Sequence, residues 1–161
     1  GLGCDATNAT AVQRIYDIKQ RTNSKAMLVL IDSSAKLQGY VREVPDIAWD
    51  LIDLSEKPLT IIYSGAKNLA ENLVAEDGSI GIRITRETFS KRLCEQFRKP
   101  IVSTSANISN TTAPKSFSEI DENIKNNVDY IVDYRQNEKI KATASSIIKL
   151  EVNGQITIIR K

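Results

Sequence analysis

The sequence contains no histidine among its 161 residues. This absence excludes the catalytic systems that depend on imidazole, namely Ser-His-Asp and Cys-His nucleophiles, histidine-ligated zinc and a histidine general base. If the chain is an enzyme, we therefore expect its chemistry to need charge stabilisation and positioning more than proton transfer.

The chain also has few cysteines, no long apolar run and a low net charge. Cys4 and Cys94 match no metal or redox spacing, so we expect two reduced thiols in a cytoplasmic protein. The longest apolar run, Met27–Ile31, is far too short to cross a membrane. The net charge of +2 provides no general basic field for binding nucleic acid, although a local basic patch remains open.

Length and composition predict one globular domain over residues 1–161, with 41% hydrophobic and 26% charged residues. Apolar spacing and capping residues predict helices over residues 8–20, 33–40, 45–54, 87–98 and 116–125. Apolar or alternating runs predict strands over residues 26–31, 58–63, 79–84, 101–103, 130–133, 145–150 and 155–160. Because helices interleave with strands early and an Asn-Gly hairpin ends the chain, we expect an α/β or α+β fold on a mixed sheet.

Two local patterns support individual helices. Phe89, Leu93 and Phe97 recur at helical spacing and predict the apolar face of the helix over residues 87–98. Ser116 and Glu119 have the spacing of a capping box at the start of the last predicted helix.

Arg83 is an unusual charge inside a predicted strand. Ser79 and Gly81 share its face, and Gly81 would let a ligand approach the backbone. A guanidinium on a sheet can bind a carboxylate or phosphate through two parallel hydrogen bonds. The alternative is the solvated outer face of an antiparallel sheet.

Further polar residues lie at the ends of predicted elements. Lys19 and Arg21 end the first helix, where they can converge on a ligand or simply interact with the helix dipole. Ser105-Ala106-Asn107 follows a strand, which is a usual place for a phosphate site, yet the same residues are common in solvated turns. The terminal hairpin brings Ser145 near Arg160, as a shared site or merely as strand ends.

Taken together, several segments resemble a known family. They are GLGCDATNATAVQRIYDIKQR, EKPLTIIY, DGSIGIRI, PIVSTSANIS and ASSIIKL with ITIIR, in that order. They resemble the YrdC-like proteins, the threonylcarbamoyl-AMP synthases of tRNA modification, over essentially the whole chain. The resemblance implies a YrdC/RibB-like twisted mixed sheet with helices around a concave, positively charged groove.

The resemblance also implies an activity. L-threonine, bicarbonate and ATP, with Mg²⁺ on the triphosphate, would give threonylcarbamoyl-AMP and pyrophosphate. A partner enzyme would then transfer the threonylcarbamoyl group to tRNA. The residues that match the family's catalytic tetrad around the nucleotide phosphates are Lys19, Arg21, Ser105 and Asn107. Arg83 matches the arginine that holds the threonine carboxylate, and the weaker candidates are Thr104 and Ser145 for threonine and Ser79 and Arg160 for ATP. No protein metal ligand is expected.

The chain departs from the family pattern in two places. The Pro-Thr-Asp-Thr type of stretch that precedes the family's Tyr-Gly-Leu-Gly is absent, so we expect a native N-terminal segment to be missing and the fragment to be catalytically incomplete. The family's Arg-Pro is Arg21-Thr22 here, and its Lys-Pro-Leu is Lys25-Ala26-Met27.

Two other classes of function stay open from the sequence. One is a noncatalytic RNA-binding member of the same fold that acts on tRNA or ribosomal RNA. The low net charge and 6% aromatic content argue mildly against it. The other is a plain partner-binding fragment.

Overall fold

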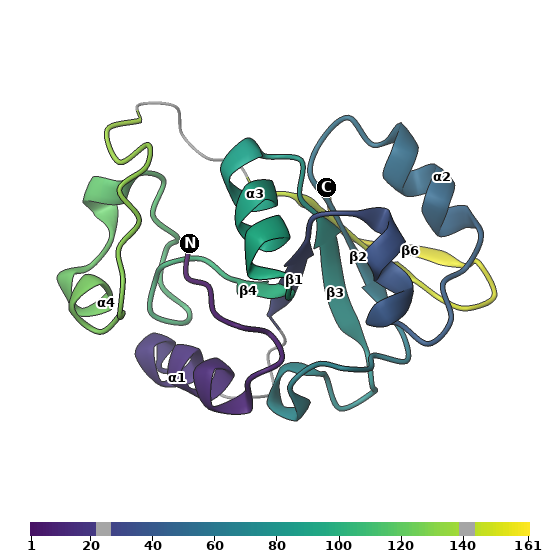
Figure 1. Cartoon of the computed structure of the whole chain (residues 1–161), viewed down its shortest axis with the longest axis horizontal. Helices are drawn as coiled ribbons and strands as arrows, with labels where there is room; N and C mark the ends of the chain where they lie inside the picture. The colour runs from purple at the N-terminus through teal and green to yellow at the C-terminus, as the bar shows by residue number, and fades with distance from the viewer. Residues whose placement is uncertain (22–26, 139–143) are drawn as a thin grey trace.

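The computed structural model describes residues 1–21, 27–138 and 144–161 (Figure 1). Within these residues, the centre is a six-stranded mixed sheet with the order β4-β1-β3-β2-β5-β6. Its strands are β1 (Leu28–Ile31), β2 (Leu59–Tyr63), β3 (Ile80–Ile84), β4 (Ile101–Ser103), β5 (Ser146–Leu150) and β6 (Ile156–Arg160). The pairs β1–β3 and β2–β5 are parallel and the other neighbours are antiparallel, which confirms the predicted mixed sheet.

The helices surround this sheet (Figure 1). They are α1 (Ala9–Lys19), α2 (Ile47–Leu54), α3 (Thr88–Phe97) and α4 (Glu122–Asn126), with the 3₁₀ turns η1 (Ser34–Gly39), η2 (Glu71–Leu73) and η3 (Phe117–Glu119). The Asn8 side chain caps α1 by accepting a hydrogen bond from the Ala11 amide. The helix ends at Gln20 in the left-handed conformation, with φ of 49°.

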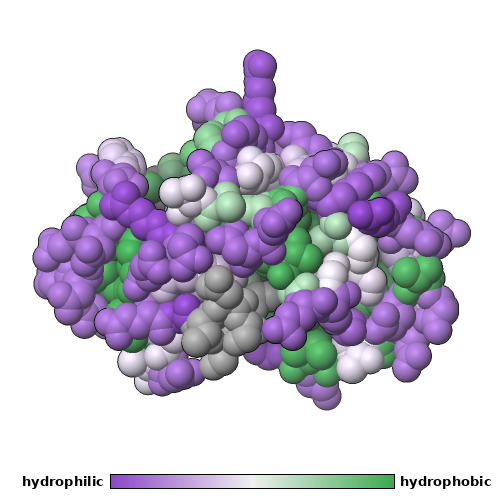
Figure 2. Space-filling model, turned by 90° about the horizontal axis from the view of Figure 1, so that it is seen from below, coloured by the Kyte–Doolittle hydropathy of each residue, from purple (hydrophilic) through white to green (hydrophobic). Residues whose placement is uncertain are grey.

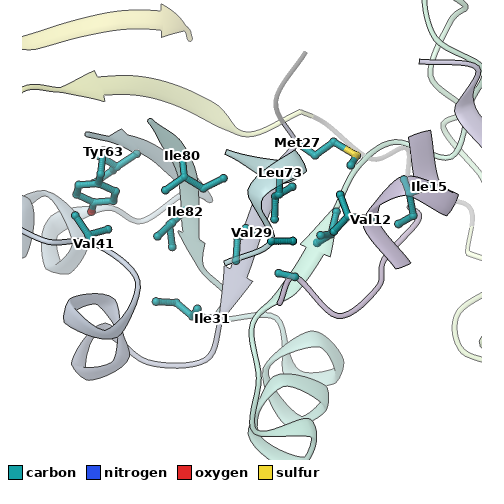
Figure 3. Close-up of a cluster of buried hydrophobic side chains, with 14 of the residues drawn as sticks. Val12, Ile15, Met27, Val29, Ile31, Val41, Tyr63, Leu73, Ile80 and Ile82 are labelled. Atoms are coloured by element: carbon teal, nitrogen blue, oxygen red, sulfur yellow. The ribbon is translucent and has the colours of Figure 1, made fainter. Parts of the chain in front are cut away.

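The core lies on one face of the sheet. Alternate side chains of the strands are buried there, among them Val29, Ile31, Ile80 and Ile82, and they pack with residues such as Val12 of α1 (Figure 3). Each fully buried aliphatic side chain of this kind stabilises the fold by about 1.5–3 kcal/mol. The residues that alternate with them along the strands occupy the other face; they are Leu28, Leu30, Thr60, Ile62, Gly81, Arg83 and Ile147. This second face carries the polar residues of interest.

The first residues of the chain extend the sheet beyond β4. The Leu2 amide donates to the Thr104 carbonyl at 2.8 Å, and the Thr104 amide donates back to Leu2 at 3.0 Å. Gly3 fits this close approach because a β-carbon there would lie only 2.9 Å from the Val102 carbonyl oxygen. The pairing therefore fixes the chain at Thr104, immediately before the Ser105–Asn107 loop.

Most predicted elements are confirmed with small changes at their ends, including the terminal hairpin at Gly154, where φ is 86°. Ala26, which began one predicted strand, lies outside the described residues, as do Thr22 and Lys25. Both cysteines are free, and burial raises the pKa of Cys4 to about 12 and that of Cys94 to about 11. The thiols therefore stay protonated near neutral pH.

Two predictions about local structure are wrong. Tyr130–Asp133 forms no strand; the segment is irregular and exposed, and Tyr130 is 77% exposed. Its β-favouring residues bury too little surface there to form a strand. The helix predicted over residues 116–125 is divided into η3 and α4; the Ser116 side chain makes no capping hydrogen bond at the start of η3, and Asp121 caps α4.

The predicted apolar face of α3 is also wrong as a core face. Leu93 and Phe97 are 42% and 43% exposed, and Cys94 is the buried residue of the helix. Phe89 stacks on Tyr134, with ring centroids 5.0 Å apart, so this part of the stripe contacts the irregular segment after α4.

The surface visible in Figure 2 is predominantly hydrophilic, and its hydrophobic residues appear as separate patches. Among the described residues, no helix combines the length and apolar character needed to span a bilayer.

Candidate functional site

Most of the polar residues predicted from the sequence lie in two clusters, and one further residue, Thr60, belongs to the second. We call the first, Lys19 with Ser105 and Asn107, the Lys19 centre. We call the second, Thr60, Arg83, Ser145 and Arg160, the Arg83 centre. Each cluster joins elements that are far apart in the sequence.

The Lys19 centre fixes the loop after β4 to the end of α1. Lys19 is only 1% exposed, and its Nζ donates to the backbone oxygens of Ser105 and Asn107 at 2.5 and 2.7 Å. A longer contact of 3.4 Å reaches the Asn107 Oδ1 atom. The Ser109 amide donates to the Lys19 carbonyl at 2.8 Å, so main chain and side chain of Lys19 both bind this loop.

The charge at the Lys19 centre is not neutralised by a carboxylate. Lys19 forms no ion pair within residues 1–21, 27–138 and 144–161. Burial lowers its pKa to about 8, and the nearby positive charge of Arg21 lowers that pKa as well. The structure thus brings Arg21 close to Lys19, just past the left-handed Gln20, where the Arg21 amide bonds the Tyr16 carbonyl at 2.9 Å. Two cations at one helix end form a region suited to an anion.

The Arg83 centre lies on the second face of the sheet, opposite the core face. Arg83 Nε donates to Thr60 Oγ1 at 3.1 Å, and its Nη2 donates to Ser145 Oγ at 2.5 Å. The two hydroxyl oxygens lie 3.3 Å apart and share a hydrogen bond. Arg160 completes the cluster, because its Nε donates to the Ser145 carbonyl at 2.8 Å.

The two arginines of this centre reinforce each other's positive potential. Burial lowers the pKa of Arg83, and the charge of Arg160 lowers it further, although a guanidinium such as that of Arg83 remains protonated near neutral pH. In the described part of the chain, neither arginine pairs with a carboxylate. Such a pair of cations can hold a carboxylate or phosphate through charge-assisted hydrogen bonds.

Other predicted residues lie outside these two centres. Ser79 is buried in the turn before β3, where it hydrogen-bonds Asp77. Thr104 is half-buried beside the Lys19 centre, and its backbone pairs with Leu2. The space above Gly81 is lined by the Thr60 methyl group, which a β-carbon would approach to 3.4 Å. The ligand roles of these residues stay predictions.

Sequence reasoning missed Thr60. It is 2% exposed and lies on β2, with the apolar residues Leu59 and Ile61 on either side. A buried hydroxyl in such a strand needs a hydrogen-bond partner, which is a signal visible in the sequence. That partner, Arg83, could not be identified without knowing that β2 pairs with β3.

The whole chain matches a known protein family. The family model for Sua5, YciO and YrdC, described as "Telomere recombination", matches residues 1–161. The chain belongs to the Sua5/YciO/YrdC family. A curated member, the threonylcarbamoyl-AMP synthase of Pseudoalteromonas translucida, is 34% identical over 159 residues, which cover 97% of this chain and 83% of the relative.

Solved structures of the family have the same fold. The crystal structure of P. abyssi Sua5 complexed with L-threonine has a TM-score of 0.83 and 25% identity, covering 93% of this chain and 44% of that one. E. coli YciO has a TM-score of 0.81 at 20% identity, covering 99% of this chain and 76% of its own. The chain thus spans less than half of the Sua5 structure and about three quarters of YciO.

Proposed function

We propose that this member of the family is a threonylcarbamoyl-AMP synthase, which forms threonylcarbamoyl-AMP and pyrophosphate from L-threonine, bicarbonate and ATP. The observation that carries the proposal is the pair of cationic centres, each without a carboxylate partner among the described residues. The curated relative of the same name supports it.

The proposed reaction joins two anions. The threonine amine would first attack the carbon of bicarbonate, a C–O bond would break with loss of water, and the carbamate N-carboxythreonine would form. A carbamate oxygen attacks the α-phosphorus of ATP, the bond from that phosphorus to the β-phosphate oxygen breaks, and pyrophosphate leaves. The attacking oxygen is already anionic, so no strong general base is required. The site must instead hold two negatively charged groups in line, which cations and fixed donors achieve.

The two centres divide this task in the proposal. Arg83 binds the threonine carboxylate, with Ser145 and Thr104 nearby on the threonine side. The nucleotide side consists of Lys19, Arg21, Ser105 and Asn107, with Ser79 and Arg160 as further contacts. The L-threonine complex of P. abyssi Sua5 supports the assignment of an amino-acid site to this fold.

Mg²⁺ would accompany the triphosphate. Among the described residues, no group of three or more His, Cys, Asp or Glu side chains could hold a metal ion. The donors that fit Mg²⁺ here are therefore phosphate oxygens and water, which it commonly retains in nucleotide sites. The ion would neutralise phosphate charge.

The product determines which partners follow. A carbamoyl-adenylate is a reactive mixed anhydride, so a transferase that delivers the group to a tRNA adenosine is the proposed consumer. We propose that this transfer to tRNA takes place in the cytoplasm.

The test is ATP–pyrophosphate exchange with radiolabelled pyrophosphate and the full-length protein. We expect exchange only when threonine and bicarbonate are both present. Absence of exchange in a protein whose near-UV circular dichroism shows correct folding would contradict the proposal. Salt-dependent retention of tRNA without any exchange would favour the noncatalytic RNA-binding alternative.

A further inference from the structure

Thr60 occupies a position where a hydroxyl has a structural cost. The residue is 2% exposed in the middle of the sheet, where valine has the same shape and needs no hydrogen bond. The strand around it is otherwise apolar, with Leu59, Ile61 and Ile62 as its neighbours. The hydroxyl is used fully, since it accepts from Arg83 and shares a hydrogen bond with Ser145.

The contacts of Arg83 explain this use. A guanidinium has five N–H donors arranged on a rigid plane. The Thr60 and Ser145 hydroxyls take the side edge formed by Nε and Nη2. The outer edge, which carries one N–H from each Nη, takes no part in these two bonds and has the geometry for a bidentate carboxylate.

The two hydroxyls hold Arg83 without neutralising it. A carboxylate at the position of Thr60 would fix the guanidinium equally well, but it would also cancel the charge that attracts an anionic ligand. Arg160 keeps the positive potential high and is itself bound to Ser145 through its Nε. The hydroxyl pair therefore combines fixed orientation with an intact positive charge.

From these contacts, we propose that Thr60 is a positioning residue that orients the Arg83 guanidinium so that its outer edge receives the carboxylate of the amino-acid substrate. This inference rests on the proposed function for the identity of the substrate. Thr60 itself does not touch the substrate; it acts through Arg83 and, together with Ser145, sets the plane of the guanidinium.

The experiment compares Thr60→Val, which keeps the shape, with Thr60→Ser, which keeps the hydroxyl. Titration calorimetry with L-threonine should show affinity reduced about tenfold or more in Thr60→Val, because a hydrogen bond to a charged group is lost. Thr60→Ser should recover most of it. In pyrophosphate exchange, the KM for threonine should rise in Thr60→Val, while the KM for ATP and kcat change less than twofold.

Thr85→Val is the matched control. Thr85 is also a buried threonine, 6% exposed, and it follows β3 outside the Arg83 centre. It should leave the affinity for L-threonine unchanged. An unchanged affinity in Thr60→Val, an equal loss of ATP and threonine affinity, or a failure of Thr60→Ser to restore binding would each overturn the proposal.

A measurement without ligand separates this proposal from the proposed function. The Arg83 Nε–H signal in ¹H–¹⁵N NMR, assigned by its loss in Arg83→Lys, should exchange slowly with water in the wild type and in Thr60→Ser. It should exchange rapidly in Thr60→Val. If the wild type neither binds L-threonine nor catalyses ATP–pyrophosphate exchange, the proposed function fails. Equal rates of Arg83 Nε–H exchange with water in the wild type and Thr60→Val would instead refute the positioning role.

Discussion

The Lys19 and Arg83 centres hold their positive charges in opposite ways. The Lys19 ammonium directs its hydrogen bonds to oxygens of one loop, two of them backbone carbonyls. Arg83 is held along one edge by two hydroxyls, and the rest of its fork takes no part in those bonds. Such anchoring occupies most of the three N–H donors of a lysine, whereas an arginine has five donors and keeps some of them for other partners.

In the proposed function, this difference separates two kinds of contribution to ligand binding. Lys19 provides a field and fixes the position of the Ser105–Asn107 loop, so its removal should affect both loop and nucleotide. In the same proposal, Arg83 recognises one ligand through directional hydrogen bonds, so its removal should affect that ligand selectively. The three variants that follow test this division, each against a different part of it.

Arg83→Ala should have the largest effect. Loss of a bidentate charge-assisted contact should weaken L-threonine binding about 100-fold, while nucleotide binding falls far less. Calorimetry with each ligand measures the two losses. Arg86→Ala is the control, because Arg86 is an exposed arginine that binds the carbonyls of Ile52 and Ser55. Equal losses for threonine and nucleotide in Arg83→Ala would erase the distinction between the centres.

Lys19→Met should have an intermediate effect that depends on pH. It removes the buried charge and leaves the loop oxygens without their donor, so nucleotide affinity near pH 7 should fall about tenfold. In the wild type, that affinity should decline as pH rises through about 8, where Lys19 loses its proton. Lys19→Met should lack this decline, and the exposed Lys91→Met should retain it.

The contribution of Lys19 to the free energy of unfolding should rise with pH, whereas the nucleotide affinity falls. The pKa of Lys19 falls from its ordinary value of 10.5 to about 8 on folding. Between these values the unfolded chain keeps a proton that the folded chain has released, so the Lys19 contribution to the free energy of unfolding rises with pH. Chemical denaturation should show wild type gaining stability relative to Lys19→Met from pH 8 to 10.5. A flat difference would contradict the lowered pKa.

Ser105→Ala should have the smallest effect, because Lys19 binds the carbonyl of Ser105 and not its hydroxyl. The free energy of unfolding should change by less than about 0.5 kcal/mol, as for most exposed positions. Nucleotide affinity should fall about threefold to tenfold if the hydroxyl contacts a phosphate. A loss of thermal stability as large as that of Lys19→Met would show that the hydroxyl belongs to the anchoring contact.

The sequence predicted the features that depend on neighbouring residues. Alternation around Arg83 placed it in β3, and the Asn153-Gly154 pair located the terminal hairpin. It misassigned Tyr130–Asp133, where β-favouring side chains have no sheet position to occupy. Local propensity is overridden there by the absence of packing surface.

The candidate site shows the same limit. Both Lys19 and Arg83 could be selected as unusual cations, and the resemblance to a family ordered them into one site. Their actual partners could not be read from the sequence. Thr60 neighbours Arg83 only because β3 lies between β1 and β2, and Lys19 meets backbone oxygens, which carry no residue-type signal.

The sequence separation of these contacts has a consequence for folding. Lys19 and Ser105 are 86 positions apart, and Arg83 and Ser145 are 62 apart. Contacts between residues so far apart in the sequence form slowly, because the chain between the two residues must first close into a loop. A partly folded chain that contains only α1 and the β1–β3 pair would thus hold the Lys19 and Arg83 side chains. It would lack their partners Ser105 and Ser145, so neither centre would be complete. Ligand binding would appear only with the last steps of folding, and ligands would stabilise only the finished topology.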